Sequence, residues 1–384
     1  MLSRTRTWIA ASCIGFCLFY AMLLLFNGGA MPTVDSAKWP KFGSSETTHE
    51  TKHGTIHTGL ATDIANDLDD NETNAESAPE GSFFTDSAKP SSPVESTHAT
   101  AASTSPQHTP TLAFATFLTG QATDDTYFNL TRTLAYQFLQ APDTRILNPD
   151  ITFIVLCGRK LPESKREILR KDGATVIGVE DVPVPSWIQT VVPRWSEQFT
   201  KLRVFQQTQY KRILYMDADY LLMKRMDDIF NESIVRQLTP TLFDRKDQIP
   251  EDEEPLPAEW LFSARSENGM TGSFDHFVPP LPTVTANAGF FLIAPQQSLF
   301  DYFMRVMQLE GRFRTTFMEQ DMLNYVFRRE GPMPWRELDW KWSANFANQR
   351  DVDNGVHALH GKFWAEGPQA VRDRWRNIMD QMEW

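Results

Sequence analysis

The chain has 384 residues, of which 41% are hydrophobic and 22% charged, and its formal net charge is -12. This length suits one large domain or two smaller ones. The 12% of aromatic residues and the lack of a heptad or Gly-X-Y repeat exclude a coiled coil, a collagen and a wholly disordered protein. Because the chain is acidic and its lysines and arginines are dispersed, no nucleic-acid partner is expected.

The N-terminus predicts a membrane anchor. Residues 8–26 are 19 consecutive residues without a formal charge, long enough as a helix to cross about 30 Å of hydrocarbon. Arg4 and Arg6 precede them, so the positive-inside rule predicts a cytosolic tail of residues 1–7 and a lumenal remainder, as in a single-pass type II protein. The alternative is a cleaved signal peptide, since small residues stand at 28–30, but such peptides have shorter apolar regions of about 7–15 residues.

Residues 27–110 predict a disordered lumenal stem. Between residues 31 and 110 there are 12 acidic residues against four lysines, and apolar residues hardly cluster. Such a segment cannot bury enough apolar surface to offset the entropy of ordering it. Five of the eight histidines lie here, but their irregular spacing favours a plain stem over a metal-binding tract. Asn71 opens a glycosylation sequon in the stem, and Asn129 and Asn231 open two more beyond it.

Strand and helix patterns alternate after Thr111. The expected strands are 112–118, 151–156, 175–179 and 212–216, and the expected helices are 127–140, 163–172 and 198–209. This order predicts an α/β domain, residues 111–384, with a mostly parallel sheet covered by helices on both faces. Ligands of such sheets bind beyond the carboxyl ends of the strands.

The three cysteines predict no disulfide in this domain. Cys13 and Cys17 lie in the apolar N-terminal segment, which leaves Cys157 alone in the domain. A single thiol at the end of an apolar run is expected to be a small buried hydrophobe.

Two carboxylates follow the strand 212–216. Asp217 and Asp219 are separated by one residue, so their side chains share a side and can both reach one hard cation. Asp-X-Asp pairs are also common on protein surfaces, but the apolar strand directly before this one directs its carboxylates into a crevice. The pair is therefore a candidate metal site.

A segment near the C-terminus suits the same site. Residues 356–364 contain His357, His360 and Lys362 around a glycine. An imidazole there can complete a metal shell and an ammonium group can meet a phosphate. The alternative is a loop held by Trp364, with its histidine hydrogen-bonded in the core.

Two further segments carry small or polar residues where a ligand can approach. Residues 285–289 are small and precede an apolar run. Glu319, Gln320 and Asp321 open an amphipathic helix and place hydrogen-bonding groups near its start. The ordinary alternatives are the start of a strand and a helix cap, but the whole ordered set is hard to explain as coincidence.

These motifs together resemble the glycogenin-like glycosyltransferases of family 8. They are, in chain order, 200–202, 216–219, 286–289, 319–324 and 357–364, and the resemblance covers about residues 111–365. It implies a GT-A fold, that is, a Rossmann-like mixed sheet, and a UDP-sugar donor. It also implies Mn²⁺ or another divalent cation, and transfer with retention of the anomeric configuration. Fungal-type Golgi enzymes with a type II anchor, resembling N-acetylglucosaminyltransferases, look nearest.

The resemblance implies a role for each residue that matches a motif. The metal ligands it implies are Asp217, Asp219 and His357. The donor-binding residues it implies are Thr119 and Tyr127 near uracil, Arg194, Lys201 toward the donor sugar, Ala218, Asn287 and Gly289 along the sugar pocket, and Lys362 on the diphosphate. Arg194 lies slightly nearer Lys201 than the arginine of the family does.

The chain departs from the family at the residues implied as catalytic. Where glycogenins have Asp-Gln, this chain has Glu319 and Gln320, followed by Asp321. Glu319 can replace the sugar-binding carboxylate with a longer arm, or Asp321 can substitute for it, so the donor sugar stays open among GlcNAc, glucose and galactose. Retention can use a carboxylate nucleophile or a front-face attack, and we favour front-face transfer with Gln320 near the anomeric carbon.

The acceptor is expected to be a glycan of a glycoprotein or glycolipid in the Golgi lumen. A long acidic insert between Phe243 and Thr283 carries Trp260 and Phe262, and it is either an aromatic lid over that acceptor or a solvated loop. Three more tryptophans, at 335, 340 and 342, are expected in the core.

Two other functions remain open at this point. One is a catalytically silent lumenal protein that binds sugar nucleotides or glycans on the same fold. The other is a phosphatase with Asp217 as nucleophile and Asp219 as acid, although such enzymes begin with this motif and this chain does not.

Overall fold

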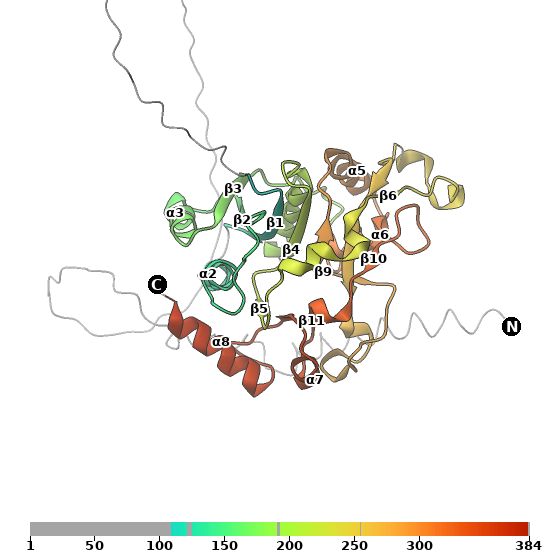
Figure 1. Cartoon of the computed structure of the whole chain (residues 1–384). Helices are drawn as coiled ribbons and strands as arrows, with labels where there is room; N and C mark the ends of the chain where they lie inside the picture. The colour runs from blue at the N-terminus through green and yellow to red at the C-terminus, as the bar shows by residue number, and fades with distance from the viewer. Residues whose placement is uncertain (1–108, 121–124, 190–192, 254, 383–384) are drawn as a thin grey trace, which may run out of the picture. The chain divides into compact units, whose positions relative to one another are not determined.

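The computed structural model describes residues 109–120, 125–189, 193–253 and 255–382 (Figure 1). The predicted anchor, residues 8–26, and residues 27–108 of the predicted stem lie outside this part of the chain. Within it, no helix combines the length and the apolar composition that crossing a membrane requires.

A seven-stranded sheet forms the centre of the domain (Figure 1). Its strands, in spatial order, are β10 (Arg336–Glu337), β8 (Phe262–Ser266), β9 (Ala286–Ile293), β4 (Arg212–Met216), β1 (Leu112–Leu118), β2 (Ile151–Gly158) and β3 (Thr175–Val179). β3, β2, β1 and β4 are parallel, whereas β9 runs antiparallel to both β4 and β8. The four strands predicted from the sequence are confirmed. The pairings of the sheet are mostly parallel, and the antiparallel β9 makes it mixed, as the family resemblance implied.

Side chains alternate across the sheet and build a core on each face. On β1, Ala113, Ala115 and Phe117 belong to one core, and Phe114 and Leu118 belong to the other. The first core is covered by the 3₁₀ helix η2 (Pro193–Gln206), α5 (Gln297–Gln308) and α6 (Glu319–Val326), and the second by α2 (Thr126–Leu139) and α3 (Glu163–Lys171). The prediction of helices on both faces is therefore confirmed.

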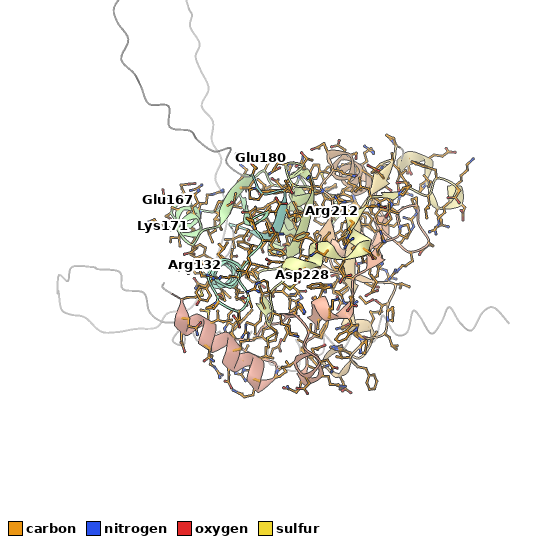
Figure 2. The ribbon with its side chains drawn as sticks, in the orientation of Figure 1. Arg132, Glu167, Lys171, Glu180, Arg212 and Asp228 are labelled. Carbon is orange, nitrogen blue, oxygen red and sulfur yellow. The ribbon has the colours of Figure 1, made fainter. Side chains whose placement is uncertain are left out.

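A buried ion pair joins the two helices of the second face. The Arg132 guanidinium on α2 donates to both carboxylate oxygens of Asp172, just beyond α3, at 2.6 and 3.0 Å. Glu167 and Lys171 lie on the exposed side of α3 (Figure 2). The pair of Arg132 and Asp172 thus faces the protein, while Glu167 and Lys171 face solvent.

A second, three-stranded sheet brings the C-terminal motif to the aspartate pair. It consists of β11 (Ser343–Asn345), β12 (Ala358–His360) and β5 (Tyr220–Leu222). β5 directly follows the Asp217–Asp219 turn and pairs antiparallel with β12, so that His360 lies opposite Tyr220. This pairing places a histidine beside carboxylates that are about 140 residues away in the sequence.

The remaining elements are short, with the exception of the 13-residue helix α8. They are η3 (Asp227–Asn231), α4 (Ser233–Arg236), β6 (Thr239–Pro240), η4 (Lys246–Gln248), η5 (Glu251–Glu253), β7 (Glu259–Trp260), η6 (Asn268–Met270), η7 (Ser273–Asp275), η8 (Trp340–Trp342), α7 (Gln349–Asp353) and α8 (Gln369–Gln381).

The insert between Phe243 and Thr283 does not present the aromatic residues predicted for a lid. Trp260 on β7 and Phe262 on β8 are fully buried, because each belongs to a strand whose side chain packs into the core. Even Glu253, from the acidic run of the insert, is buried, and it accepts a hydrogen bond of 2.6 Å from the Tyr302 hydroxyl. The lid prediction is therefore wrong for Trp260 and Phe262.

Other core predictions hold. Trp335 and Trp342 are buried, and Trp340 is half-buried. Cys157 is completely buried at the end of β2, and this burial raises the pKa of its thiol to about 12. The interpretation of Cys157 as an unreactive small hydrophobe is confirmed.

Candidate active site

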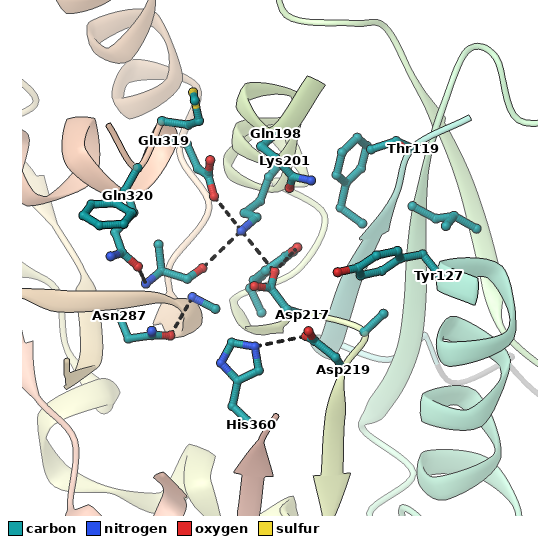
Figure 3. A pocket seen from close by; sticks show the side chains of 18 residues that line it. Thr119, Tyr127, Gln198, Lys201, Asp217, Asp219, Asn287, Glu319, Gln320 and His360 are labelled. Atoms are coloured by element: carbon teal, nitrogen blue, oxygen red, sulfur yellow. Dashed lines mark hydrogen bonds and ion pairs between the residues drawn. The ribbon is translucent and has the colours of Figure 1, made fainter. Parts of the chain in front are cut away.

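A pocket of about 290 Å³ opens beyond the carboxyl ends of β1 and β4. This is the edge of the sheet at which the sequence predicted ligand binding. The pocket brings together many of the predicted residues, namely Thr119, Tyr127, Lys201, Asp217, Ala218, Asp219, Asn287, Gly289, Glu319 and Gln320. In Figure 3, Thr119 and Tyr127 lie on one side of the aspartate pair, and Glu319 and Gln320 lie on the other.

Asp217, Asp219 and His360 form the polar centre of the pocket. Each offers one ligand atom, and these three atoms lie within 4.8 Å of one another. The His360 Nε2 is 3.0 Å from the Asp219 Oδ1, and the Tyr215 hydroxyl donates to the Asp217 Oδ1 at 3.0 Å (Figure 3). Two carboxylates and an imidazole are a suitable donor set for a divalent cation such as Mn²⁺.

The third member of this set is His360, and the structure does not bring the predicted His357 to the aspartate pair. His360 is the last residue of β12 and pairs with Tyr220, whereas His357 precedes that strand and its carbonyl accepts from the N–H groups of Met223 and Lys224. The His357 Nδ1 lies 3.1 Å from the Arg225 carbonyl oxygen, and its ring packs edge-on against Trp342. His357 therefore matches the alternative prediction, in which a histidine of this loop is hydrogen-bonded within the protein. His360 is the histidine that lies beside the aspartate pair.

Mutual ionisation stabilises the pair of His360 and Asp219. Burial alone would lower the pKa of His360, but the Asp219 carboxylate raises it above its ordinary value. Burial would likewise raise the pKa of Asp219, but His360 and, more weakly, Lys362 hold it below its ordinary value. Lys362 is exposed and does not line the pocket, yet its charge acts on Asp219 from the rim.

Gly289 makes room for this centre. A Cβ on Gly289 would lie 2.8 Å from the Asp217 Oδ2, 2.9 Å from the His360 Cε1 and 3.0 Å from the Asn287 Oδ1. The Gly289 carbonyl also accepts a hydrogen bond of 2.9 Å from the Asp217 backbone N–H. A residue without a side chain is thus required by the close approach of the strand to the carboxylates.

Lys201 connects this centre to the other end of the pocket. Its ammonium group lies 3.0 Å from the Asp217 Oδ1 and 2.7 Å from the Glu319 Oε1 (Figure 3). Burial would lower the pKa of Lys201, but Asp217 and Glu319 together raise it, so the side chain stays charged. Lys201 and Glu319 are both buried, and their pairing fixes the start of α6 next to the aspartate pair.

The start of β9 extends beyond the end of β4 at the pocket, and α6 supplies hydrogen-bond partners there. The register between β8 and β9 shifts so that Arg265 pairs with Asn287 while its neighbour Ala264 pairs with Phe291. The Gln320 Oε1 accepts from the Ala288 N–H at 2.9 Å. One turn later, Asn324 bonds both the N–H and the carbonyl of residue 286, at 2.7 and 2.9 Å.

Asn287 is held by an acid that the sequence did not single out. Its Nδ2 donates to the Glu267 Oε2 at 2.7 Å, and its Oδ1 accepts from the Gly289 N–H at 2.9 Å. Glu267 directly follows β8, whose sequence Phe-Ser-Ala-Arg-Ser lacks the apolar run that marked the strand before the aspartate pair. Sequence reasoning also missed Tyr215, Gln198 and Phe317, which line the pocket.

Asp321 is not among the pocket-lining residues. The Asp321 Oδ2 accepts a hydrogen bond of 2.8 Å from the Phe317 N–H, so this carboxylate is directed into the turn before α6. The carboxylate that lines this end of the pocket is therefore that of Glu319, and the structure does not bring Asp321 to it. Arg194 belongs to η2, and its side chain lies outside the described residues.

Comparison with known proteins assigns the chain to a family. No protein-family model matches it. Two uncharacterized proteins of Schizosaccharomyces pombe are each 31% identical to it, one over 67% of this chain and 74% of its own length, the other over 64% and 71%. The chain belongs to the same family as these two proteins.

More distant relatives of this chain have names that state a function. Galactinol synthase 5 of Arabidopsis thaliana is 27% identical to it over 173 residues, which cover 44% of this chain and 49% of that enzyme. A solved structure of the galactosyltransferase LgtC with donor and acceptor sugar analogs matches with a TM-score of 0.44 and 14% identity, over 71% of this chain and 96% of that one. The homologues indicate that this protein is an enzyme of the glycosyltransferase class.

Proposed function

We propose that this enzyme is a retaining hexosyltransferase that moves GlcNAc, glucose or galactose from a UDP-sugar to a glycan acceptor. The observation that carries the proposal is the convergence of Asp217, Asp219 and His360 beside the buried pair of Lys201 and Glu319 in one pocket. When the bond between an anomeric carbon and a diphosphate breaks, negative charge develops on the diphosphate. A bound cation beside a polar recess for the sugar can stabilise that charge.

We assign the two ends of the pocket to the two parts of the donor. Thr119 and Tyr127 lie on the side of β1 and α2, and we assign them to uracil. Lys201, Glu319 and Asn287 lie on the opposite side, where their charged and amide groups suit the hydroxyls of a sugar. The aspartate pair between them then meets the diphosphate.

The main catalytic task of the site is to stabilise the negative charge of the departing diphosphate. Asp217, Asp219 and His360 would hold Mn²⁺ or another divalent cation, which supplies neutralisation of the diphosphate when bound. Lys362 adds a positive charge from the rim, where its exposed ammonium group can reach a phosphate oxygen. Lys201 stays charged beside the sugar and keeps Glu319 in place as a hydrogen-bond acceptor.

We propose front-face transfer as the route to retention. The bond from the anomeric carbon to the diphosphate oxygen breaks, the acceptor oxygen bonds to the same face of that carbon, and the acceptor proton passes to the departing phosphate. The side chains near the start of α6 support this route over a covalent intermediate. Glu319 is held by Lys201, Asp321 is directed to the turn, and Gln320 carries a neutral amide. A sugar adduct on any of these three residues, found by mass spectrometry after reaction with a 2-fluoro donor analogue, would overturn it.

We further propose that the enzyme works in the Golgi lumen as a single-pass type II membrane protein. Residues 1–7 would be the cytosolic tail, 8–26 the anchor, 27–110 the stem and 111–384 the catalytic domain. The uncharged segment and the preceding arginines support this topology. Protection of a C-terminal tag from protease in intact Golgi vesicles would test it, and digestion of the tag without detergent would contradict it.

The central test is a screen of residues 109–384 for hydrolysis of UDP-sugars with and without Mn²⁺. We expect one UDP-sugar to be hydrolysed only with the cation, because the cation neutralises the leaving diphosphate, and we expect Asp219→Asn to lose this activity. Asp143→Asn, which alters an exposed carboxylate paired with Arg374, is the control and should keep the activity. Full activity of Asp219→Asn would refute the assignment of the metal centre.

A further inference from the structure

An exposed aromatic side chain stands at the mouth of the pocket. Phe317 lines the pocket, and half of its side chain is exposed to solvent, at 50%. It precedes Glu319 by two residues, so it belongs to the end of the pocket that lies across the aspartate pair from Thr119 and Tyr127. The other aromatic side chain of the same loop, Phe313, is buried against Trp187 and needs no such explanation.

The backbone at this position is held in a costly conformation. Met318 has a φ of 51° and a ψ of -122°, a region that residues with side chains rarely adopt. Its own side chain is buried, and the Asp321 carboxylate accepts the Phe317 N–H at 2.8 Å. These two anchors fix the turn, so Phe317 is kept at the mouth of the pocket and cannot fold back into the core.

The neighbouring polar groups are already engaged with one another. Lys201 bonds Glu319, and Gln320 bonds the backbone of β9. The donor sugar has its hydroxyl partners in this recess, so the apolar ring at its edge adds a different kind of contact. A pyranose has C–H groups on its ring faces, and these pack on an exposed phenyl ring while the hydroxyls stay hydrated.

We infer that Phe317 forms an acceptor subsite, on which the apolar face of a pyranose ring stacks, and that Asp321 positions it. The inference rests on the proposed function, since the acceptor must meet the anomeric carbon from the open side of the donor pocket. It gives Asp321 a role distinct from the catalytic one first expected for it. The acceptor class it specifies is a glycan whose terminal pyranose exposes a flat C–H face.

Saturation-transfer NMR tests the subsite with methyl glycosides of glucose, galactose, mannose and GlcNAc, added to the protein with Mn²⁺ and UDP. We expect at least one glycoside to receive saturation on its ring protons, and we expect Phe317→Ala to weaken its binding about tenfold, the scale of one aromatic stacking contact. Phe317→Trp keeps a ring and should retain the binding. The control is Phe243→Ala, since Phe243 is equally exposed at 51% but does not line the pocket, and it should leave the binding unchanged.

Two variants separate positioning by Asp321 from a general structural role. Asp321→Ala removes the acceptor of the Phe317 N–H and should weaken glycoside binding as Phe317→Ala does, whereas Asp321→Asn keeps an acceptor oxygen and should restore it. Equal loss of glycoside and UDP affinity in Phe317→Ala, or no saturation of any glycoside by wild type, would overturn the subsite. Failure of the proposed function differs from both, because wild type would then bind no UDP with Mn²⁺.

Discussion

Substitution of Gly289 by alanine should weaken cation binding without removing a ligand. The added Cβ would lie 2.8 Å from the Asp217 Oδ2, where ordinary contact begins at 3.4 Å, so the carboxylate must retreat by the difference of about 0.6 Å. It would also press on His360 from 2.9 Å. Metal–ligand distances are fixed within about 0.2 Å, so a shift of this size displaces both ligands from one coordination sphere.

The expected loss of Mn²⁺ affinity is about 10- to 100-fold, the range seen when groups that orient metal ligands are altered. The free energy of unfolding should fall by about 1–3 kcal/mol, because the extra methyl group overpacks the site. Isothermal titration of Mn²⁺ into the UDP-bound protein measures the first effect, and urea unfolding measures the second.

Gly158→Ala is the matched control for Gly289→Ala. Gly158 also lies at a strand end, but a Cβ there would make only ordinary contacts of 3.7 and 3.8 Å, so Mn²⁺ affinity should stay unchanged. If Gly289→Ala bound Mn²⁺ as tightly as Gly158→Ala, the close approach of β9 to the carboxylates could not be the reason for glycine at position 289.

Three further predictions follow from the polar groups of the domain. His360→Asn should lower Mn²⁺ affinity at least tenfold while His357→Asn keeps it, by the same titration, and the reverse result would restore His357 as the ligand. Lys201→Met leaves two carboxylates near each other without their cation and should lower the free energy of unfolding by about 3–5 kcal/mol in urea, where a neutral effect would contradict the pairing. Burial alone would lower the pKa of His276, but its hydrogen bond to Asp351 raises the pKa above its ordinary value of 6.5. The contribution of protonated His276 to the free energy of unfolding is therefore complete below pH 6.5 and is lost as the pH rises through the raised pKa. The urea midpoint of wild type should therefore fall above that pH, and His276→Asn should abolish this fall.

The sequence predicted the parallel half of the sheet well, because each of those strands is a continuous apolar run. The strands 112–118, 175–179 and 212–216 begin and end where they were expected. The reversal of β9 could not be predicted in this way, since its apolar pattern is the same in either direction. What fixes its direction is pairing with β4 and β8, which depends on residues distant in the sequence.

The sequence indicated which types of residue meet in the pocket, namely two aspartates and a histidine, but it did not indicate which histidine. The aspartate pair was placed correctly because both carboxylates follow one strand end. The choice between His357 and His360 depended on which face of β12 meets the turn, and that is set by its pairing with β5. Asp321 lies outside the pocket for a similar reason, because one step along the start of α6 turns a side chain from the pocket into the preceding turn.

The bonds from α6 to the backbone of β9 bear on how donor preference can change in evolution. The side chains of Gln320 and Asn324 bond the backbone of β9 at residues 286 and 288. Their replacement would leave these backbone groups without partners and would disturb the sheet. Among the described residues, Glu319 bonds no backbone group of β9, and its side chain is paired with Lys201. A substitution at position 319 therefore leaves the backbone bonds of β9 in place but removes a partner of buried Lys201, so a library that diversifies positions 319 and 201 together is the direct route to an altered donor.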